Sequence, residues 1–340
     1  MGITGTISKE SAIEKINELG RAGKPFQFLI SFDGSEHLIA SPGEAVELGF
    51  YLDMPGWNTA ELTETAGPGS GSGSQASRGP VRFDKHPVDP LMYQHAFNRV
   101  MEEIRYGNTF LLNLTFPTEV ETNLTLTEIY SRSMARFKLL LQDQIVVFSP
   151  ERFIRIEGNR IRTHPMKGTM DASIPGAYHK LMTDPKEDAE HNTIVDLLRN
   201  DLSMIASKVQ VRRFKHIEKI QTHQGELLQM SSEITGILPN NYQSSLGEIL
   251  SSMLPAGSIS GAPKRKTLGI IQQVENYRRG FYTGIFGYFN GHEMDVAVAI
   301  RYMEKQGDMM IFKSGGGITF QSNWEKEYQE MLDKVYVPFS

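Results

Sequence analysis

The chain has 340 residues, of which 39% are hydrophobic and 22% are charged, and it contains no cysteine. This length and composition are typical of a soluble globular protein with one large domain or two smaller ones. The absence of cysteine excludes disulfides, thiolate metal sites and cysteine nucleophiles, so any catalysis must use oxygen and nitrogen groups. The formal net charge of −5 argues against a nucleic-acid partner. No apolar run approaches the roughly 18 residues of a membrane span, so we expect a cytoplasmic protein without a membrane partner.

The first 66 residues predict a small N-terminal α/β portion. A helix over 9–19 ends at Gly20, and strands over 25–32 and 37–40 flank Asp33-Gly34, a hairpin turn signal. Residues 67–80, GPGSGSGSQASRGP, offer almost nothing to bury and therefore predict a flexible Gly/Ser loop. We expect this loop to lead into a catalytic domain over 81–340.

Beyond the loop, strand patterns come in neighbouring pairs that are separated by helix patterns. Asp89-Pro90 is a helix start signal, and the helix that follows runs to Gly107. The further expected elements are a strand over 110–116, a helix over 126–137, a strand over 145–148, a hairpin over 152–163, a helix over 185–207, a hairpin made of 294–303 and 309–313, and a closing helix over 323–335. This order predicts an α+β protein with antiparallel sheets flanked by helices.

Lys167 follows the hairpin over 152–163, which returns the chain to the level of Glu151. A three-residue hairpin loop would place the two side chains on one face and a two-residue loop would not, because a slip of one residue reverses the face. A lysine beside a carboxylate is either a plain ion pair or a nucleophile with an acid/base partner. Spacing alone favours the ion pair.

Two pairs of glutamates lie on predicted helices. Glu187 and Glu190 share a face at the start of the long helix, where acids also simply cap the helix N-terminus. Glu327 and Glu330 fall with Lys334 within about 60° of arc on the closing helix, at about 100° per residue. Glu330 and Lys334 are also spaced as an ordinary i,i+4 ion pair. Two half-buried carboxylate pairs would be unfavourable without a cation, and oxygen ligands on two helices suit Mg²⁺.

Two glycine-containing segments could bind an anion. Pro263 predicts a helix start with three cations in its first turn, Lys264 to Lys266, which are unfavourable there unless an anion lies nearby and are otherwise solvated charge. The segment 314–317, SGGG, predicts a bend between a strand and the last helix, either with N–H groups that hold a carboxylate or with no ligand. Arg301, on the facing strand, is a candidate carboxylate fork. Together these features predict a site for a small polyanionic substrate.

Eight segments, in chain order, resemble the chorismate-utilising enzymes, the family of anthranilate synthase component I, isochorismate synthase and aminodeoxychorismate synthase component I. They are SPERF (149–153), PMKGT (165–169), EDAEHNTIVDLLRND (187–201), PAGSISGAPK (255–264), GFYTGIFGY (280–288), VAIRYM (298–303), SGGGI (314–318) and EKEYQEMLDK (325–334). The resemblance implies the fold of these enzymes in a short form and chorismate as the substrate.

The resemblance also implies roles for individual residues. Lys167 is expected to add to C2 of chorismate as the 4-hydroxyl leaves, with Glu151 as the general acid/base; ammonia then attacks C4 and expels the lysine. The implied product is 4-amino-4-deoxychorismate, the precursor of p-aminobenzoate and folate. The implied Mg²⁺ ligands are Glu187, Glu190, Glu327 and Glu330. The implied substrate contacts are Gly168, Thr169, Ser258, Tyr282, Arg301, Gly316, Gly317 and Lys334.

Within the family, PMKGT resembles the aminodeoxychorismate synthase version, because anthranilate synthases typically have alanine in place of Lys167. Leu111 stands where many members have glutamine, or lysine in the isochorismate-forming branch, and leucine cannot activate water. Gln229 replaces a histidine that anthranilate synthases use around pyruvate loss. The alternatives are anthranilate synthase component I and a non-catalytic chorismate-binding protein, which would not need Lys167, Glu151 and four glutamates.

Two further expectations follow from the resemblance. The N-terminal part is shorter than in the long members, so we predict no tryptophan site. Glutamine-dependent amination by the usual route of the family needs a cysteine nucleophile, which this chain does not contain. We therefore expect a separate glutamine amidotransferase subunit to supply ammonia, with free ammonia serving in its absence.

Overall fold

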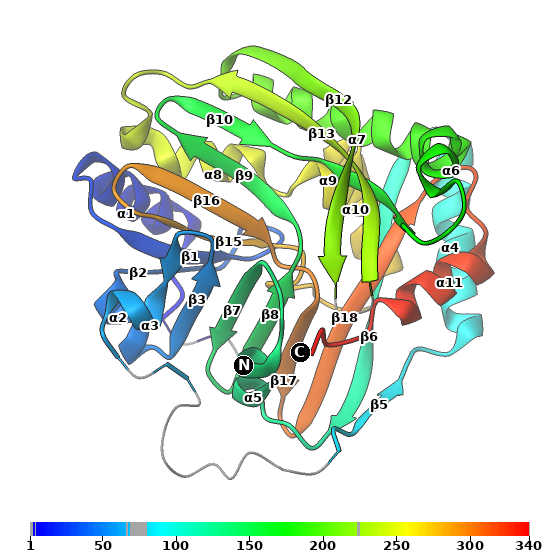
Figure 1. Cartoon of the computed structure of the whole chain (residues 1–340), viewed down its shortest axis with the longest axis horizontal. Coiled ribbons are helices and arrows are strands. Elements are labelled where there is room, and N and C mark those ends of the chain that lie inside the picture. The colour runs from blue at the N-terminus through cyan, green and yellow to red at the C-terminus, as the bar shows by residue number, and fades with distance from the viewer. Residues whose placement is uncertain (1–2, 4, 66, 69–79, 223–224, 340) are drawn as a thin grey trace.

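The computed structural model describes residues 3, 5–65, 67–68, 80–222 and 225–339. Most of the predicted Gly/Ser loop, residues 69–79, lies outside the described residues (Figure 1). In the described ranges the strands form two nine-stranded sheets, and every strand pair is antiparallel.

The first sheet begins at the strand that carries Lys167 and ends in the N-terminal region. Its order is β11 (Met166–Asp171), β13 (Gly225–Ile237), β10 (Arg160–Thr163), β9 (Arg152–Glu157), β16 (Glu293–Val298), β15 (Ile285–Phe289), β1 (Phe26–Ile30) and β2 (His37–Ala40), and β12 (Ser207–Thr222) pairs with β13.

The second sheet also joins distant parts of the sequence. Its order is β14 (Gly261–Ala262), β6 (Leu111–Thr122), β18 (Met309–Ile318), β17 (Tyr302–Gln306), β8 (Ile145–Ser149), β7 (Phe137–Leu141), β3 (Phe50–Met54) and β4 (Trp57–Asn58), and β5 (Phe83–His86) pairs with β6. The N-terminal portion thus gives two strands to the end of each sheet.

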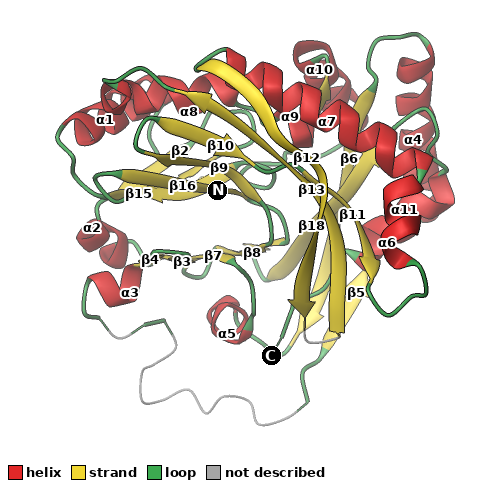
Figure 2. Cartoon of the chain, turned by 45° about the horizontal axis from the view of Figure 1, so that its top comes forward, coloured by secondary structure: helices red, strands yellow, loops and turns green. Residues whose placement is uncertain are grey.

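Helices pack on the outer faces of the sheets, as Figure 2 shows. The helices are α1 (Lys9–Arg21), α2 (Pro42–Glu47), α3 (Thr59–Leu62), α4 (Pro90–Arg105), α5 (Leu126–Arg132), α6 (Ala177–Thr183), α7 (Pro185–Ser203), α8 (Leu246–Met253), α9 (Gly257–Ser260), α10 (Lys264–Val274) and α11 (Trp324–Asp333), with a 3₁₀ turn over Tyr242–Ser245. Side chains from α1, α7 and α8 form one core with the first sheet, and side chains from α4, α10 and α11 form another with β6 and β18.

The two sheets face each other across a third core, and the alternation of side chains along each strand explains why both faces are apolar. On β1, Phe26 and Phe28 pack with the helices, whereas Leu29 packs toward the second sheet. On β7, Phe137 and Leu139 join the core between the sheets, whereas Leu140 packs on the opposite side. The predicted α+β class with antiparallel sheets flanked by helices is confirmed.

Several predicted elements are confirmed with their capping residues. Asp89 and Asn323 accept hydrogen bonds at the starts of α4 and α11. The first helix is present as well, but it continues through Gly20, its predicted end, to Arg21. The hairpin around Gly158-Asn159 is formed by β9 and β10.

Other predicted elements were wrong in their extent. The helix expected over 126–137 ends at Arg132, because Phe137 already belongs to a strand buried on both faces. The helix expected over 185–207 ends at Ser203, since β12 begins at Ser207. The long β12–β13 hairpin was not predicted.

The expected strand over 294–303 was also wrong, because it is two strands in different sheets. The chain leaves β16 in the first sheet, turns at Ala299–Arg301 and enters β17 in the second sheet, and β17 then forms the hairpin with β18. Arg301 therefore lies in a turn, with φ of 53°, and not on a strand. The glycines of 314–317 lie within β18 itself and do not form the predicted bend.

A second connection between the sheets lies beside this turn. The chain passes from β8 to β9 through Pro150 and Glu151. The N–H of Val298 donates to the carbonyl of Glu151 at 3.1 Å, and the N–H of Phe148 donates to the carbonyl of Arg301 at 3.1 Å. These bonds join the two connections, so Glu151 and Arg301 lie together where the sheets diverge.

Candidate active site

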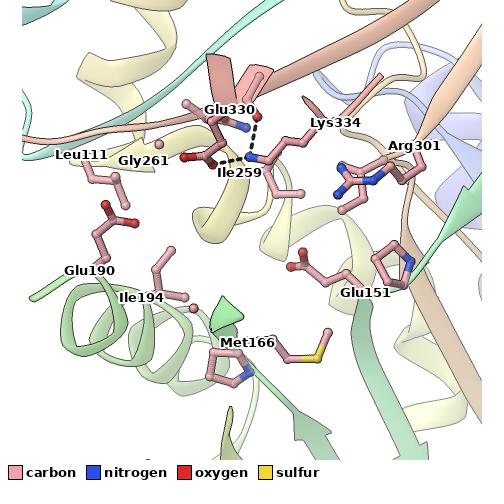
Figure 3. Close-up of a pocket in the computed structure, with 18 of the residues that line it drawn as sticks. Leu111, Glu151, Met166, Glu190, Ile194, Ile259, Gly261, Arg301, Glu330 and Lys334 are labelled. Atoms are coloured by element: carbon pink, nitrogen blue, oxygen red, sulfur yellow. Dashed lines mark hydrogen bonds and ion pairs between the residues drawn. The ribbon is translucent and has the colours of Figure 1, made fainter. Parts of the chain in front are cut away.

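A cavity of about 560 Å³ lies at this divergence. Its walls come from both sheet connections, from β11, β6 and β18, and from helices α7 and α11 on opposite sides (Figure 3). Among the residues that line it are Glu151, Met166, Gly168, Glu187, Glu190, Tyr282, Arg301, Gly316, Gly317, Glu330 and Lys334. Predicted site residues from seven of the eight sequence segments thus lie around one cavity.

Arg301 gives the cavity a cation with an unused donor. Its guanidinium lies over the ring of Tyr336, 5.3 Å from the centroid. Its Nε atom is buried and has no hydrogen-bond partner among the described residues. Because an unsatisfied buried donor is costly, this atom is suited to an anionic ligand that enters the cavity.

The first pair of glutamates approaches the cavity from α7. Glu190 is buried, with 7% of its surface exposed. Glu187 lies against Gly168, where an added Cβ would be 3.0 Å from Glu187 Oε2. The N–H of Glu187 donates to Asp184 Oδ1 at 3.1 Å, so the Asp184 side chain caps the start of α7. Glu187 therefore serves the helix start and the cavity at once.

The second pair approaches from α11. A Cβ added to Gly316 would lie 3.4 Å from Glu330 Oε1 and 3.5 Å from Glu327 Oε2, so both carboxylates border the glycine strand. Glu327 is 1% exposed. Lys334 Nζ donates to Glu330 Oε1 at 2.6 Å and to the carbonyl of Gly315 at 2.8 Å. The i,i+4 ion pair is thus present, and both partners also line the cavity.

These four carboxylates fit a hard divalent cation in their chemistry. All donors are oxygens, and two of the four side chains are buried. Glu187, Glu190 and Glu330 line the cavity from two helices on opposite sides, and Glu327 lies beside Gly316 in its wall. Within the described ranges, no group of three or more His, Asp or Glu side chains already stands close enough to hold a metal ion. The donor set therefore suits an ion that keeps waters or bridges through a substrate, as Mg²⁺ does.

Comparison with known proteins assigns the family. Residues 59–340 match the chorismate binding enzyme family. The chain belongs to this family. It is 47% identical over 326 residues to an "Uncharacterized PabA-like protein" from Haemophilus influenzae, which covers 96% of both chains.

Relatives with named activities are more distant. The chain is 33% identical to aminodeoxychorismate synthase component 1 from Escherichia coli, over 72% of this chain and 56% of that one. It is 36% identical to anthranilate synthase component 1 from Aquifex aeolicus, over 57% of this chain and 40% of that one.

Solved structures of chorismate-utilising enzymes have the same fold. The putative 2,3-dihydroxybenzoate-specific isochorismate synthase DhbC from Bacillus anthracis gives a TM-score of 0.71 at 19% identity, covering 98% of this chain and 90% of that chain. Anthranilate synthase component I from Streptococcus pneumoniae gives a TM-score of 0.70 at 22% identity, covering 91% of this chain and 79% of that chain.

None of the helices in the described ranges is long and apolar enough to cross a membrane.

Lys167, the predicted nucleophile, lies on β11 with its backbone opposite Met230. The side chains of Lys167, Thr169 and Ser258 lie outside the described part of the chain. The β9–β10 loop has two residues, the length that would separate Glu151 and Lys167. Loop length does not decide the relative placement of these two residues, however, because β11 pairs with β13 and not with β9.

One of the three cations at the start of α10, Lys264, has a protein anion as its partner. Lys264 Nζ donates to Asp201 Oδ1 at 2.9 Å, and the N–H of Gly257 donates to Asp201 Oδ2 at 3.3 Å. Burial raises the pKa of Asp201, and Lys264 opposes this effect. The solvated-charge interpretation is therefore wrong for Lys264, which with Asp201 links α7 to the segment that contains Ser258.

Other cavity residues of this family member were not predicted as site residues. Leu111 and Gln229, noted only as departures from the family pattern, line the wall, and so do Ile194, Ile259, Asn113, Asp333 and Lys313. Tyr282, a predicted residue of the same wall, has a raised pKa because its side chain is buried. Asn113 faces Gly317 across the β6–β18 pair, a register that only the sheet order reveals. Asp333 lies three residues after Glu330, so helix spacing could have found it.

Proposed function

We propose that this protein is an aminodeoxychorismate synthase component I, which converts chorismate and ammonia into 4-amino-4-deoxychorismate through a covalent Lys167 adduct. One observation carries the proposal. The strand that contains Lys167 borders, at Met166 and Gly168, a cavity that also contains Glu151, Arg301 and Lys334. Its register shifts between Lys167 and Thr169, and this irregularity breaks the strict alternation that would otherwise turn the Lys167 side chain away from the cavity. An amine nucleophile, an acid and two cations are the groups that amination of a dicarboxylate requires.

In the proposed reaction the neutral amine of Lys167 forms a bond to C2 of chorismate. Both ring double bonds shift, C1=C2 to C1=C6 and C5=C6 to C4=C5, the C4–O bond breaks, and Glu151 gives its proton to the departing hydroxyl, which leaves as water. Ammonia then forms a bond to C4, both double bonds shift back, and the C2–N bond to Lys167 breaks. A proton from the attacking ammonia returns to Glu151, so chorismate and ammonia give 4-amino-4-deoxychorismate and water.

Binding of the two substrate carboxylates is assigned to the cations and to the acidic pairs. Arg301, through its unpaired Nε, and Lys334 would each bind a carboxylate oxygen. Glu187, Glu190, Glu327 and Glu330 would hold Mg²⁺. When bound, the ion would neutralise and orient one substrate carboxylate.

Anthranilate synthase is the main competing activity, because relatives with both names match this chain at about the same identity. Gln229, where anthranilate synthases have histidine, lines the wall and supports amination without pyruvate loss. Leu111, which cannot activate water, also lines the wall and argues against an isochorismate-forming activity.

We further propose that ammonia comes from a separate glutamine amidotransferase subunit. The chain has no cysteine to attack glutamine. With glutamine alone we expect no product, and with an ammonium salt we expect turnover. Product from glutamine and this chain alone would contradict the proposed partner.

The proposed reaction is tested by incubating the protein with chorismate, Mg²⁺, an ammonium salt and an excess of aminodeoxychorismate lyase. Chromatography should detect p-aminobenzoate and no fluorescent anthranilate. Glu151→Gln should reduce the rate by about 10²- to 10⁴-fold, the usual contribution of a positioned acid/base. Lys167→Ala should abolish p-aminobenzoate formation and also a chorismate-derived mass adduct on the Lys167 peptide when ammonia is withheld.

Lys180→Ala, which removes an exposed lysine from neighbouring α6, is the matched control and should keep the wild-type rate. Anthranilate as the product would favour the competing activity. An undiminished rate in Lys167→Ala would overturn the covalent mechanism.

The metal assignment has its own test. Calorimetric titration of Mg²⁺ in the presence of chorismate should show binding to the wild type, and Glu190→Gln should weaken it about tenfold or more, the usual effect of altering a metal site. Glu325→Gln removes an exposed carboxylate from the same helix as Glu327 and should leave the affinity unchanged. Equal affinities in all three proteins would remove Glu190 from the proposed ligands.

A further inference from the structure

Lys313 is a buried cation that none of the proposed steps uses. Its side chain is 2% exposed and forms an ion pair at 2.8 Å with Glu304, whose side chain is 16% exposed. Its Nζ atom also donates to the carbonyls of Arg279 at 3.0 Å and Arg278 at 3.3 Å. Three acceptors match the three N–H donors of an ammonium group, so the group is held in one position.

These acceptors belong to different segments, each of which continues into the cavity. Lys313 itself lies on β18, two residues before Gly315. The carbonyls lie three and four residues before Tyr282. Glu304 lies on β17, three residues after Arg301. The single ammonium group therefore joins the three segments that carry the glycine strand, Tyr282 and Arg301.

Lys313 also separates two cavities. It lines the candidate active site, and it lines a second cavity of about 940 Å³ that Glu304, Tyr302 and Arg278 border as well. Its aliphatic stem and ammonium group are thus part of a shared wall. The rings of Tyr302 and Tyr277 lie 5.4 and 5.5 Å from Nζ and enclose it further.

We propose that Lys313 is a positioning residue for chorismate, which fixes Tyr282, Arg301 and the glycine strand in the arrangement that binds the substrate. It acts through the three segments and does not itself need to touch the reacting atoms. Displacements of about 1 Å in such supporting contacts can cost an enzyme about 10²-fold in rate, because the bound substrate is held in the wrong position. The inference rests on chorismate as the ligand, and it holds whether the product is aminodeoxychorismate or anthranilate.

A simpler role would be charge balance. Glu304 accepts hydrogen bonds from the hydroxyl of Tyr302 and from the side-chain amide of Gln306, both at 2.6 Å, and it needs a cation nearby because it is largely buried. If Lys313 only neutralises Glu304, removing both charges should restore wild-type behaviour. If Lys313 positions the cavity, removing both should restore stability and leave chorismate binding impaired.

The test uses Lys313→Met, which keeps the volume of the stem and removes the charge, and the double variant Lys313→Met/Glu304→Gln. Chorismate affinity with Mg²⁺ present is measured by calorimetry, and stability by thermal unfolding. We expect both variants to bind chorismate about ten- to a hundredfold more weakly than the wild type. The double variant should regain most of the unfolding temperature that the single variant loses.

Lys305→Met is the matched control, because Lys305 is an exposed lysine that borders the second cavity from the same hairpin. It should bind chorismate with wild-type affinity. Wild-type affinity in the folded double variant would reduce Lys313 to charge balance and overturn the proposal. Because the readout is binding, a failure to form p-aminobenzoate would count against the proposed reaction and leave this result unchanged.

Discussion

Gly168 lies where β11 borders the cavity, and its φ of 70° is in the left-handed region. Gly168→Ala should cost about 1–2 kcal/mol for that conformation and about 1–3 kcal/mol more for overpacking, because the new Cβ would lie 2.8 Å from Leu181 Cδ1 and 3.0 Å from Glu187 Oε2. Gly158→Ala is the matched control, since Gly158 has φ of 57° and open space around its Cβ. Denaturant unfolding should show a clearly larger loss for Gly168→Ala; equal losses would mean that the contact with Glu187 relaxes freely.

His164 lies between β10 and β11, and burial lowers its pKa below the ordinary 6.5. Its Nδ1 atom is buried without a partner in the described ranges. As the pH falls below 6.5 the unfolded chain takes up this proton before the folded chain does, so folding stability should fall. His164→Gln should reduce the slope of unfolding free energy against pH between about 6.5 and 5.

His37, whose pKa burial lowers as well, should keep part of that slope. His95→Gln, at an exposed position on α4, should leave the slope unchanged. An unaltered slope in His164→Gln would show that this histidine is protonated equally in both states.

At the residue scale, the sequence could predict groups whose chemistry is distinctive and whose motif is recognisable. Arg301 and Lys334 belong to this class, and both line the cavity. Asn113 and Lys313 do not, because their positions depend on the pairing of β6 with β18 and of β18 with β17. A lysine in a strand gives no local sign that it will be 2% exposed and bound to the carbonyls of another segment.

At the element scale, Asp201 determines how three helices meet, because it joins the end of α7 to Gly257 on α9 and Lys264 on α10. Lys264→Met should destabilise the protein by about 1–3 kcal/mol, since it leaves a carboxylate with 10% exposure without its cation. Lys264→Met/Asp201→Asn should recover part of this loss, with a coupling of about 0.5–3 kcal/mol in a double-mutant cycle of denaturant unfolding. Additive losses would show that the two side chains act independently.

Element types were predictable where the pattern was local. The capped helices α4 and α11 and the β9–β10 hairpin follow from residues close together in the sequence. The boundary at Phe137 was not predictable in this way, because a short, largely apolar strand that is buried on both faces cannot be told from a buried helix by periodicity alone. The strand change at Ala299–Arg301 is likewise invisible to periodicity, since both strands read as one apolar segment.

At the scale of the whole molecule, the site forms where the chain crosses twice between the two sheets, from β8 to β9 and from β16 to β17. Glu151 and Arg301 each lie on a connection from one sheet to the other, and backbone hydrogen bonds join these connections. The sequence predicted antiparallel sheets but could not order the eighteen strands of the described residues, because pairs such as β1 with β15 join residues more than 250 positions apart. The motif residues were therefore predictable as a set and their relative placement was not.

The family match begins at residue 59, after β1 to β4, yet these four strands are integral parts of the two sheets. β1 pairs with β15 in the first sheet and β3 pairs with β7 in the second. A chain reduced to residues 59–340 would expose both partner strands as new edges and uncover the core between the sheets, where Leu139 and Phe286 are completely buried. It should therefore aggregate or lose cooperative thermal unfolding, and it should not bind chorismate in calorimetry.

Supplying residues 1–58 as a second chain during refolding should restore part of both cooperative unfolding and chorismate binding, because it returns the missing strands. Cooperative unfolding of residues 59–340 at the wild-type temperature, with chorismate binding intact, would show instead that the matched region folds by itself.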